Sequence, residues 1–200
     1  MGRVHLAGNV YLRWSARRAQ NATRTSQVGW GDEFRIGLAG STRRVLTPRG
    51  IKVRQLVELR RDWYWLAVVI VPRTGVLEAQ WMGRLGGEDF LPVLRDWHDA
   101  DIDHLVWDGL PGHRGLQSGT TPMPTIIQPA ASPELNPAER VGEVIRAAVE
   151  GRTYSTLWRK MLAVEDVLHD LQGDRDRVKQ LTGYPWILDA LKELPWRGSH

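Results

Sequence analysis

The chain has 200 residues, of which 42% are hydrophobic, so it is long enough to form one medium-sized domain with a core. It has no cysteine, and this absence excludes a disulfide framework and a thiolate metal site. The net charge of +4 is uneven: residues 1–61 hold 13 Lys and Arg against 3 Asp and Glu, and residues 62–200 hold 14 against 20. This asymmetry indicates a polyanion partner for the first part, with a solvated basic tail as the alternative, and the longest apolar runs, such as that at 63–71, are too short to cross a bilayer as a helix.

The N-terminal half of the chain predicts strands. Residues 1–26 look weakly structured and basic, and residues 27–37 read as a first strand that two glycines weaken. The stretch 43–59 predicts two short strands around a Pro-Arg-Gly turn. A buried strand follows at 63–72, and the PRTG turn leads into another strand at 76–82.

The C-terminal half alternates strands with helices and ends in helices. Apolar spacing near 3.6 predicts a helix over 87–100. Residues 109–123, with four Gly and two Pro, predict a loop between the short strands 104–108 and 125–129. Asn136 is a good N-cap for a helix that Gly151 ends. Further helices are expected near 155–171, 174–182 and 185–193. This order predicts an α/β fold with a mixed sheet.

Three carboxylates on three of these elements form the main candidate site. Asp32 opens the pair DE on the first strand, Asp108 ends the strand HLVWD, and Glu139 lies in the first turn of the helix that begins near Asn136. Carboxylate oxygens suit magnesium or manganese. Two such ions can hold the attacking and leaving oxygens of a phosphodiester displacement.

Each acid also has a purely structural explanation. Asp108 precedes Gly109, a pair typical of turns. Glu139 has the spacing of a capping box with Asn136, although the helix dipole there also favours an ionised ligand. Asp32 could be a solvent-facing charge on its strand. Strand neighbours face opposite sides, so Glu33 is expected to point away from the cluster.

Histidine and tryptophan add weaker candidates. His113, five residues after Asp108, could bind a phosphate oxygen or orient a carboxylate. His104, Asp108 and His113 could form a zinc triad, but no helical histidine pair supports it. Of the ten tryptophans, four fall on or beside strands and are expected to be mostly core, namely Trp63, Trp65, Trp81 and Trp107. Trp14 and Trp30 could stack on bases.

Three segments together resemble one family. They are DEFRIGLAGSTRRVLTPRG at 32–50, HLVWDGLPGHR at 104–114 and QPAASPELNPAER at 128–140. They resemble, in order, the motifs of the DDE transposases of bacterial insertion sequences, in the mariner-like superfamily of the insertion sequence 630 type. The tail GRTYSTLWRKMLAVEDVLHDLQ also looks like the C-terminal helices of that family.

The resemblance implies an RNase H-like mixed sheet flanked by helices, with extra C-terminal helices, over residues 27–195. It implies Asp32, Asp108 and Glu139 as the catalytic triad, binding two Mg²⁺ ions that Mn²⁺ can replace. The activity expected is metal-dependent hydrolysis of DNA phosphodiesters and strand transfer at transposon ends. Basic residues are then expected to hold backbone phosphates rather than read bases. The candidates are Arg43, Arg44, Arg49, Lys52, Arg54, His113 and Arg114.

Family members carry a helix-turn-helix module before the first acid, and 31 residues precede Asp32 here. The expectation is therefore a truncated or split-frame copy that acts on duplex DNA in the bacterial cytoplasm, at the nucleoid. Its expected partners are a second copy, as a homodimer on DNA, and a separately encoded helix-turn-helix half. An inactive DNA-binding or regulatory remnant and another RNase H-like nuclease are the alternatives.

Overall fold

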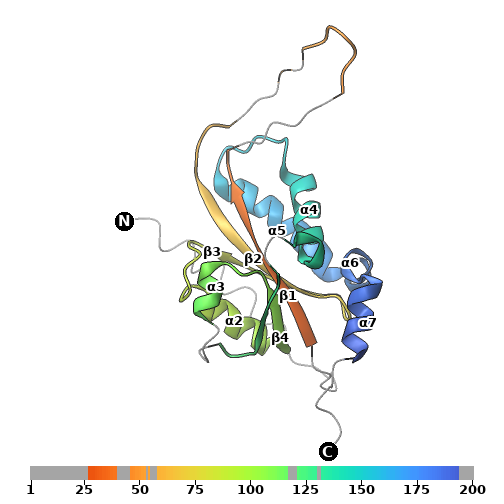
Figure 1. Ribbon diagram of the computed structural model, residues 1–200. Helices are drawn as coiled ribbons and strands as arrows, with labels where there is room; N and C mark the ends of the chain where they lie inside the picture. The colour runs from red at the N-terminus through yellow and green to blue at the C-terminus, as the bar shows by residue number, and fades with distance from the viewer. Residues whose placement is uncertain are drawn as a thin grey trace, which may run out of the picture.

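The computed structural model describes residues 27–39, 46–52, 54, 58–116, 121–129 and 132–193. The predicted basic segment 1–26 lies outside these residues. Within them the chain forms one mixed five-stranded sheet in the order β3-β2-β1-β4-β5, flanked by helices, as the sequence predicts (Figure 1). The strands are β1 (Gln27–Gly37), β2 (Trp63–Val71), β3 (Val76–Met82), β4 (Ile102–Trp107) and β5 (Thr125–Ile127).

The central strand β1 is antiparallel to β2 and parallel to β4. On one face, α4 (Ala138–Val149), α5 (Leu157–Gly173), α6 (Arg175–Thr182) and α7 (Pro185–Glu193) pack around one core, and α2 (Phe90–Asp99) and α3 (Pro111–Gly115) cover the other face (Figure 1). The three C-terminal helices expected from the sequence are therefore present, with bounds within two residues of the predicted ones.

Strand β2 is apolar without interruption because both of its faces are covered. Leu66, Val68 and Ile70 enter the core under α4 and α5, whereas Ala67 and Val69 enter the core under α2. All five are fully buried. A strand buried on both sides is expected to show a continuous apolar run rather than alternation.

The alternation of β1 decides which way each acid points. Val28, Trp30 and Phe34 lie in the core under α4 and α5, so even-numbered residues, Asp32 among them, face that side. Gly29 stands on the opposite face, where a Cβ would lie 2.5 Å from the Val69 side chain. Gly29, one of the two glycines that weaken the strand pattern, thus leaves room for the Val69 side chain of the neighbouring strand.

Two of the predicted elements were wrong. The described residues of 43–59 form no strand: Leu46 and Ile51 are exposed, and Gly50 adopts a φ of 91° in the turn. An alternating sequence needs a neighbouring strand and a core to cover it, and the described residues of this stretch have neither. The region 109–123 is also more than loop, because its residues Pro111–Gly115 form α3.

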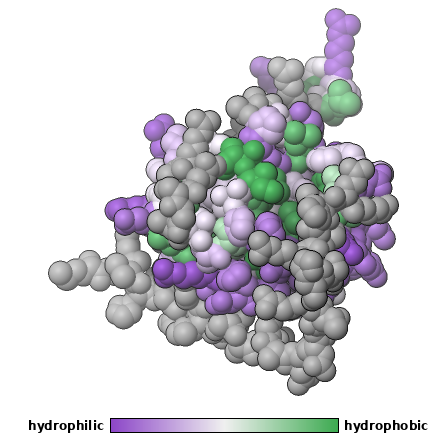
Figure 2. Space-filling model, turned by 60° about the horizontal axis from the view of Figure 1, so that its bottom comes forward, coloured by the Kyte–Doolittle hydropathy of each residue, from purple (hydrophilic) through white to green (hydrophobic). Residues whose placement is uncertain are grey.

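The surface carries scattered exposed aromatic residues, such as Trp63 on β2 and Trp186 on α7. Figure 2 shows one face on which hydrophilic residues surround a smaller hydrophobic area. In the described part of the chain, no helix has the length and apolar character needed to cross a membrane.

Candidate active site

Asp32 lies in the middle of the sheet on the face that α4 covers. Its Oδ1 accepts a hydrogen bond of 2.8 Å from the backbone N–H of Glu33. Its Oδ2 is buried and has no hydrogen-bond partner among the described residues. A buried carboxylate oxygen without a donor is costly unless a cation or a proton satisfies it.

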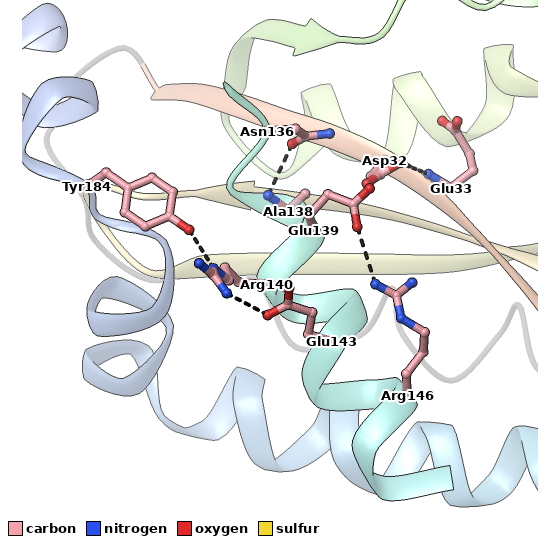
Figure 3. Close-up of polar contacts among 9 residues, drawn as sticks. All are labelled: Asp32, Glu33, Asn136, Ala138, Glu139, Arg140, Glu143, Arg146 and Tyr184. Atoms are coloured by element: carbon pink, nitrogen blue, oxygen red, sulfur yellow. Dashed lines mark hydrogen bonds and ion pairs between the residues drawn. The ribbon is translucent and has the colours of Figure 1, made fainter. Parts of the chain in front are cut away.

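Glu139 is brought to Asp32 by Asn136. The Asn136 amide donates to the carbonyl of Gly31, the residue before Asp32, at 3.1 Å, and its Oδ1 accepts from the N–H of Ala138. This side chain ties the start of α4 to β1 beside the acid. Figure 3 shows the Glu139 carboxylate turned toward Asp32.

The capping-box explanation of Glu139 is wrong. Its Oε2 accepts a hydrogen bond of 3.3 Å from Arg146 on the same helix, and the Asn136 N–H donates instead to the carbonyl of Pro133 (Figure 3). Asn136 still satisfies the N–H of Ala138, while the preceding residues 133–135 form a 3₁₀ turn. The carboxylate of Glu139 is thus available to the site.

Asp108 reaches the same place through the parallel pairing of β4 with β1. The last paired residues are Trp30 and Val106, so Asp32 and Asp108 follow two positions later on neighbouring strands. The Asp108 side chain is half exposed. Its Oδ1 accepts from the N–H of Leu110 at 3.1 Å, so it forms the predicted turn and also lies at the site.

The electrostatics of Asp32 reveal that the acids gather. Burial, and then the charges of Glu139, Glu33 and Asp108, raise its pKa from 3.8 to about 8, against the lowering effect of the Glu33 N–H. Several carboxylates close together in a partly dry place repel one another until a proton or a cation compensates them. These oxygen donors are the kind that Mg²⁺ and Mn²⁺ prefer, so the residues fit the divalent ions that the resemblance implies.

Glu33 points to the opposite side of β1, as the sequence predicts (Figure 3). There its Oε1 lies 3.4 Å from Nε2 of His113, which is only 1% exposed. Burial lowers the pKa of His113, but Glu33 and Asp108 outweigh this effect, and the pKa is raised overall. A histidine so enclosed fits the orientation of a carboxylate better than contact with DNA.

Among the described residues, the acidic and histidine side chains whose ligand atoms lie within 4.8 Å of one another are Glu33, Asp108 and His113. His104 is not among them, so the zinc triad that the sequence offered only as a weak alternative is not assembled. The ligand atoms of Asp32, Asp108 and Glu139 are not gathered this tightly in the described part of the chain, and Asp108 Oδ1 lies 2.8 Å from Nδ1 of His113. The catalytic and metal-binding roles of these three acids stay predictions.

A groove of about 380 Å³ runs from Asp32 and Glu139 along β1 and α4. The cations on its lining, which sequence reasoning missed, are Arg35, Arg146 and Lys160. Arg146 could have been found, because seven positions after Glu139 place it on the same face of the helix. Lys160 comes from another helix, where it donates to the carbonyl of Gly37, and no local pattern marks it.

Only some of the residues predicted to contact DNA lie in the described part of the chain. Arg49, Lys52 and Arg54 are exposed, whereas Arg43, Arg44 and the side chain of Arg114 lie outside the described residues. Trp30 is 7% exposed and belongs to the core, so its predicted stacking on bases is wrong. Trp14 also lies outside the described residues.

No family model and no curated protein matches the chain. Solved structures that are similar in fold include two Mos1 complexes. One is a Mos1 transposase paired-end complex with left transposon end, with 12% identity and a TM-score of 0.52; the other is a mariner Mos1 paired end complex with Mg, with 14% identity and a TM-score of 0.51. Each match covers 79% of this chain and 56% of the other, so the chain spans little more than half the length of these structures. The likeness confirms the predicted RNase H-like fold.

Proposed function

We propose that this chain is a transposase catalytic domain that hydrolyses DNA phosphodiesters and transfers strands with divalent metal ions. The observation that carries the proposal is that burial, and then the charges of Glu139, Glu33 and Asp108, raise the pKa of Asp32 to about 8; Asp32 lies on β1, Asp108 follows β4 and Glu139 lies at the start of α4. The fold, which is similar to that of complexes with a transposon end and with Mg, supports the same conclusion.

The three acids would hold two Mg²⁺ ions. Bound there, the ions would activate a water or a DNA 3′ hydroxyl and stabilise the leaving oxygen. The Asp32 carboxylate must be ionised to serve as a ligand, so it loses its proton when a cation binds. No side chain has to become a covalent nucleophile in this reaction.

The chain's cations would hold the DNA backbone on either side of the acids. Arg35 and Arg146 line the groove beside Asp32 and Glu139. Arg49 and Lys52 are exposed on the segment that follows β1. Such cations neutralise phosphates and set the register of a duplex without reading its sequence. Duplex DNA, a second copy of the chain and a separately encoded helix-turn-helix half are the partners of this proposal.

Nicking of supercoiled plasmid by the full chain with Mg²⁺ or Mn²⁺ tests the proposal. Asp108→Asn removes one ligand charge and keeps the shape of the side chain, so we expect nicking to be abolished while the fold and nonspecific DNA binding persist. Asp99→Asn, at an exposed position on α2, is the matched control and should nick like the parent.

Nicking by Asp108→Asn within a few-fold of the parent would rule out this residue as a ligand. A parent chain that binds plasmid but never nicks it, with either metal, is the inactive DNA-binding domain that the sequence left open. Stronger cleavage of an RNA–DNA hybrid than of duplex DNA would instead identify another RNase H-like nuclease.

A further inference from the structure

Glu33 and His113 form a buried polar pair behind the acidic site. The Glu33 side chain is 3% exposed and that of His113 is 1% exposed. Their facing atoms, Oε1 and Nε2, are 3.4 Å apart and have no other partner among the described residues. Burying a carboxylate and a histidine side by side is costly, so a pair kept in the core calls for a further role.

The ring of His113 is fixed in its plane by two aromatic neighbours. It stacks on Trp107 with ring centres 3.9 Å apart and planes 6° apart. Phe90 meets it edge-on, with centres 4.8 Å apart. With Glu33 on one edge of the ring, this packing leaves the imidazole a single orientation.

The other edge of the ring faces Asp108. His113 Nδ1 lies 3.1 Å from the Asp108 carbonyl oxygen and 2.8 Å from its Oδ1. The same Oδ1 accepts the N–H of Leu110. Within the described part of the chain, Oδ2 of Asp108 has no such donor. One carboxylate oxygen is therefore occupied, and the other is left for a ligand.

The alternative that this cluster is itself a metal site does not agree with the geometry. Glu33 lies at Nε2 and Asp108 at Nδ1, on opposite edges of one imidazole. Their ligand atoms lie within 4.8 Å of one another, but Nδ1 of His113 faces the carbonyl oxygen of Asp108 at 3.1 Å and must therefore carry a proton. A nitrogen that donates this hydrogen bond is not free to bind an ion, which leaves only Nε2 beside Glu33.

We propose that Glu33 and His113 are positioning residues that hold Asp108 with Oδ1 turned inward and Oδ2 presented toward Asp32 and Glu139. The inference rests on the proposed function, because it assigns the pair a task only if Asp108 is a metal ligand. It separates the two acids of the DE pair: Asp32 serves the site directly, and Glu33 serves it through His113 from the other face of the sheet.

Binding of Mn²⁺ to the full chain, followed by electron paramagnetic resonance, tests the inference apart from activity. His113→Phe keeps a ring that can stack on Trp107 but removes both nitrogens. We expect it to weaken Mn²⁺ binding roughly tenfold or more, as loss of an outer-shell partner does. His113→Asn should recover part of the affinity, because its amide can donate to Asp108 in place of Nδ1.

Two further variants help to distinguish a specific loss of Mn²⁺ binding from a general loss of folding. Glu33→Gln keeps the shape of the pair without its charge, and it should weaken Mn²⁺ binding less than His113→Phe does. His169→Phe, at an exposed position on α5, is the matched control and should bind Mn²⁺ like the parent. Thermal unfolding of each variant shows whether the fold is retained.

The outcomes separate the two proposals. A folded His113→Phe chain with the Mn²⁺ affinity of the parent overturns the positioning role and leaves the proposed function standing. The positioning role is also overturned if His113→Phe and His113→Asn weaken Mn²⁺ binding equally and lose thermal stability equally. A histidine with a purely structural role would behave in this way. A parent chain that binds no Mn²⁺ removes the proposed function, and the inference falls with it.

Discussion

At the scale of single residues, Asp32 combines burial with acidic neighbours. Unfolded, it releases its proton near pH 3.8, whereas burial and then its acidic neighbours hold the proton in the folded chain up to about pH 8. Between these values the folded state binds more protons than the unfolded state. The free energy of unfolding of the metal-free protein therefore falls as pH rises through this window.

Asp32→Asn should remove this part of the pH dependence. The amide keeps the shape of the carboxyl and does not ionise, so the variant should be more stable than the parent above pH 8 in EDTA and should gain nothing near pH 4. The difference is at most roughly 1.4 kcal/mol for each pH unit of the window. Thermal unfolding of both proteins between pH 4 and pH 9 measures this difference in stability, with Asp99→Asn as the control. If stability depends on pH in the same way in Asp32→Asn and in the parent, the raised pKa of Asp32 is contradicted.

The sequence predicted that the two neighbouring acids point to opposite sides of the strand. Strand alternation places Asp32 with the apolar residues Trp30 and Phe34, and Glu33 on the opposite face. It could not predict the partner of Glu33. That partner is His113, 80 positions away, and only the packing of α3 against the sheet brings it close.

At the scale of elements, the contact of α4 with β1 sets the place of Glu139. Gly142 lies one turn after Glu139 and faces Phe34, where a Cβ would stand 2.4 Å from Cε1 and 2.6 Å from Cζ of the ring. Helices are usually stabilised by replacing glycine with alanine. Here the close approach of helix and strand requires the glycine.

Gly142→Ala should therefore destabilise the protein by about 1–3 kcal/mol, as overpacking does, although alanine favours a helix by about 1 kcal/mol. It should also weaken Mn²⁺ binding, because α4 must move away from β1 and take Glu139 with it. Urea unfolding and metal titration measure both effects. Gly173→Ala, at the end of α5 where a Cβ would meet nothing within 4 Å, is the control and should lose neither; a Gly142→Ala chain as stable as the parent would show that the contact is loose.

Elements were predictable where local pattern and burial agree. The apolar run of β2 and the cap and stop of α4 are local signals, and both elements form where expected. The stretch 43–59 has the pattern of strands, but its described residues pair with no strand of the sheet. Helix α3 was not predicted because glycines and prolines, which have low helix propensity, surround and interrupt it. The burial of His113 and Leu116 stabilises this helix rather than the helix propensity of its residues.

At the scale of the whole molecule, positive charge gathers on the segment between β1 and β2. Its described residues 46–52 stand clear of the sheet (Figure 1), and Arg49, Lys52 and the nearby Arg54 are exposed. Charges held away from the acidic cluster can meet a phosphate backbone without repulsion from the site. We therefore propose this segment as the place of nonspecific contact with a duplex.

Replacing Arg49, Lys52 and Arg54 with Ala should weaken binding to all duplexes about equally. If each residue neutralises one phosphate, the slope of log affinity against log salt should fall by roughly three. A salt titration with two unrelated duplexes measures this. Replacing the exposed Arg175 and Arg177 of α6 is the control, and an equal loss in that variant would show that any surface charge has the same effect.

The central claim is that Asp32, Asp108 and Glu139 together bind divalent metal. The most direct measurement is the anomalous scattering of Mn²⁺ in crystals of the full chain. We predict manganese between the carboxylates of Asp32 and Glu139 and the Oδ2 of Asp108, with none between Glu33 and His113. Crystals that bind no manganese at these three acids, or that bind it only beside His113, would contradict the account.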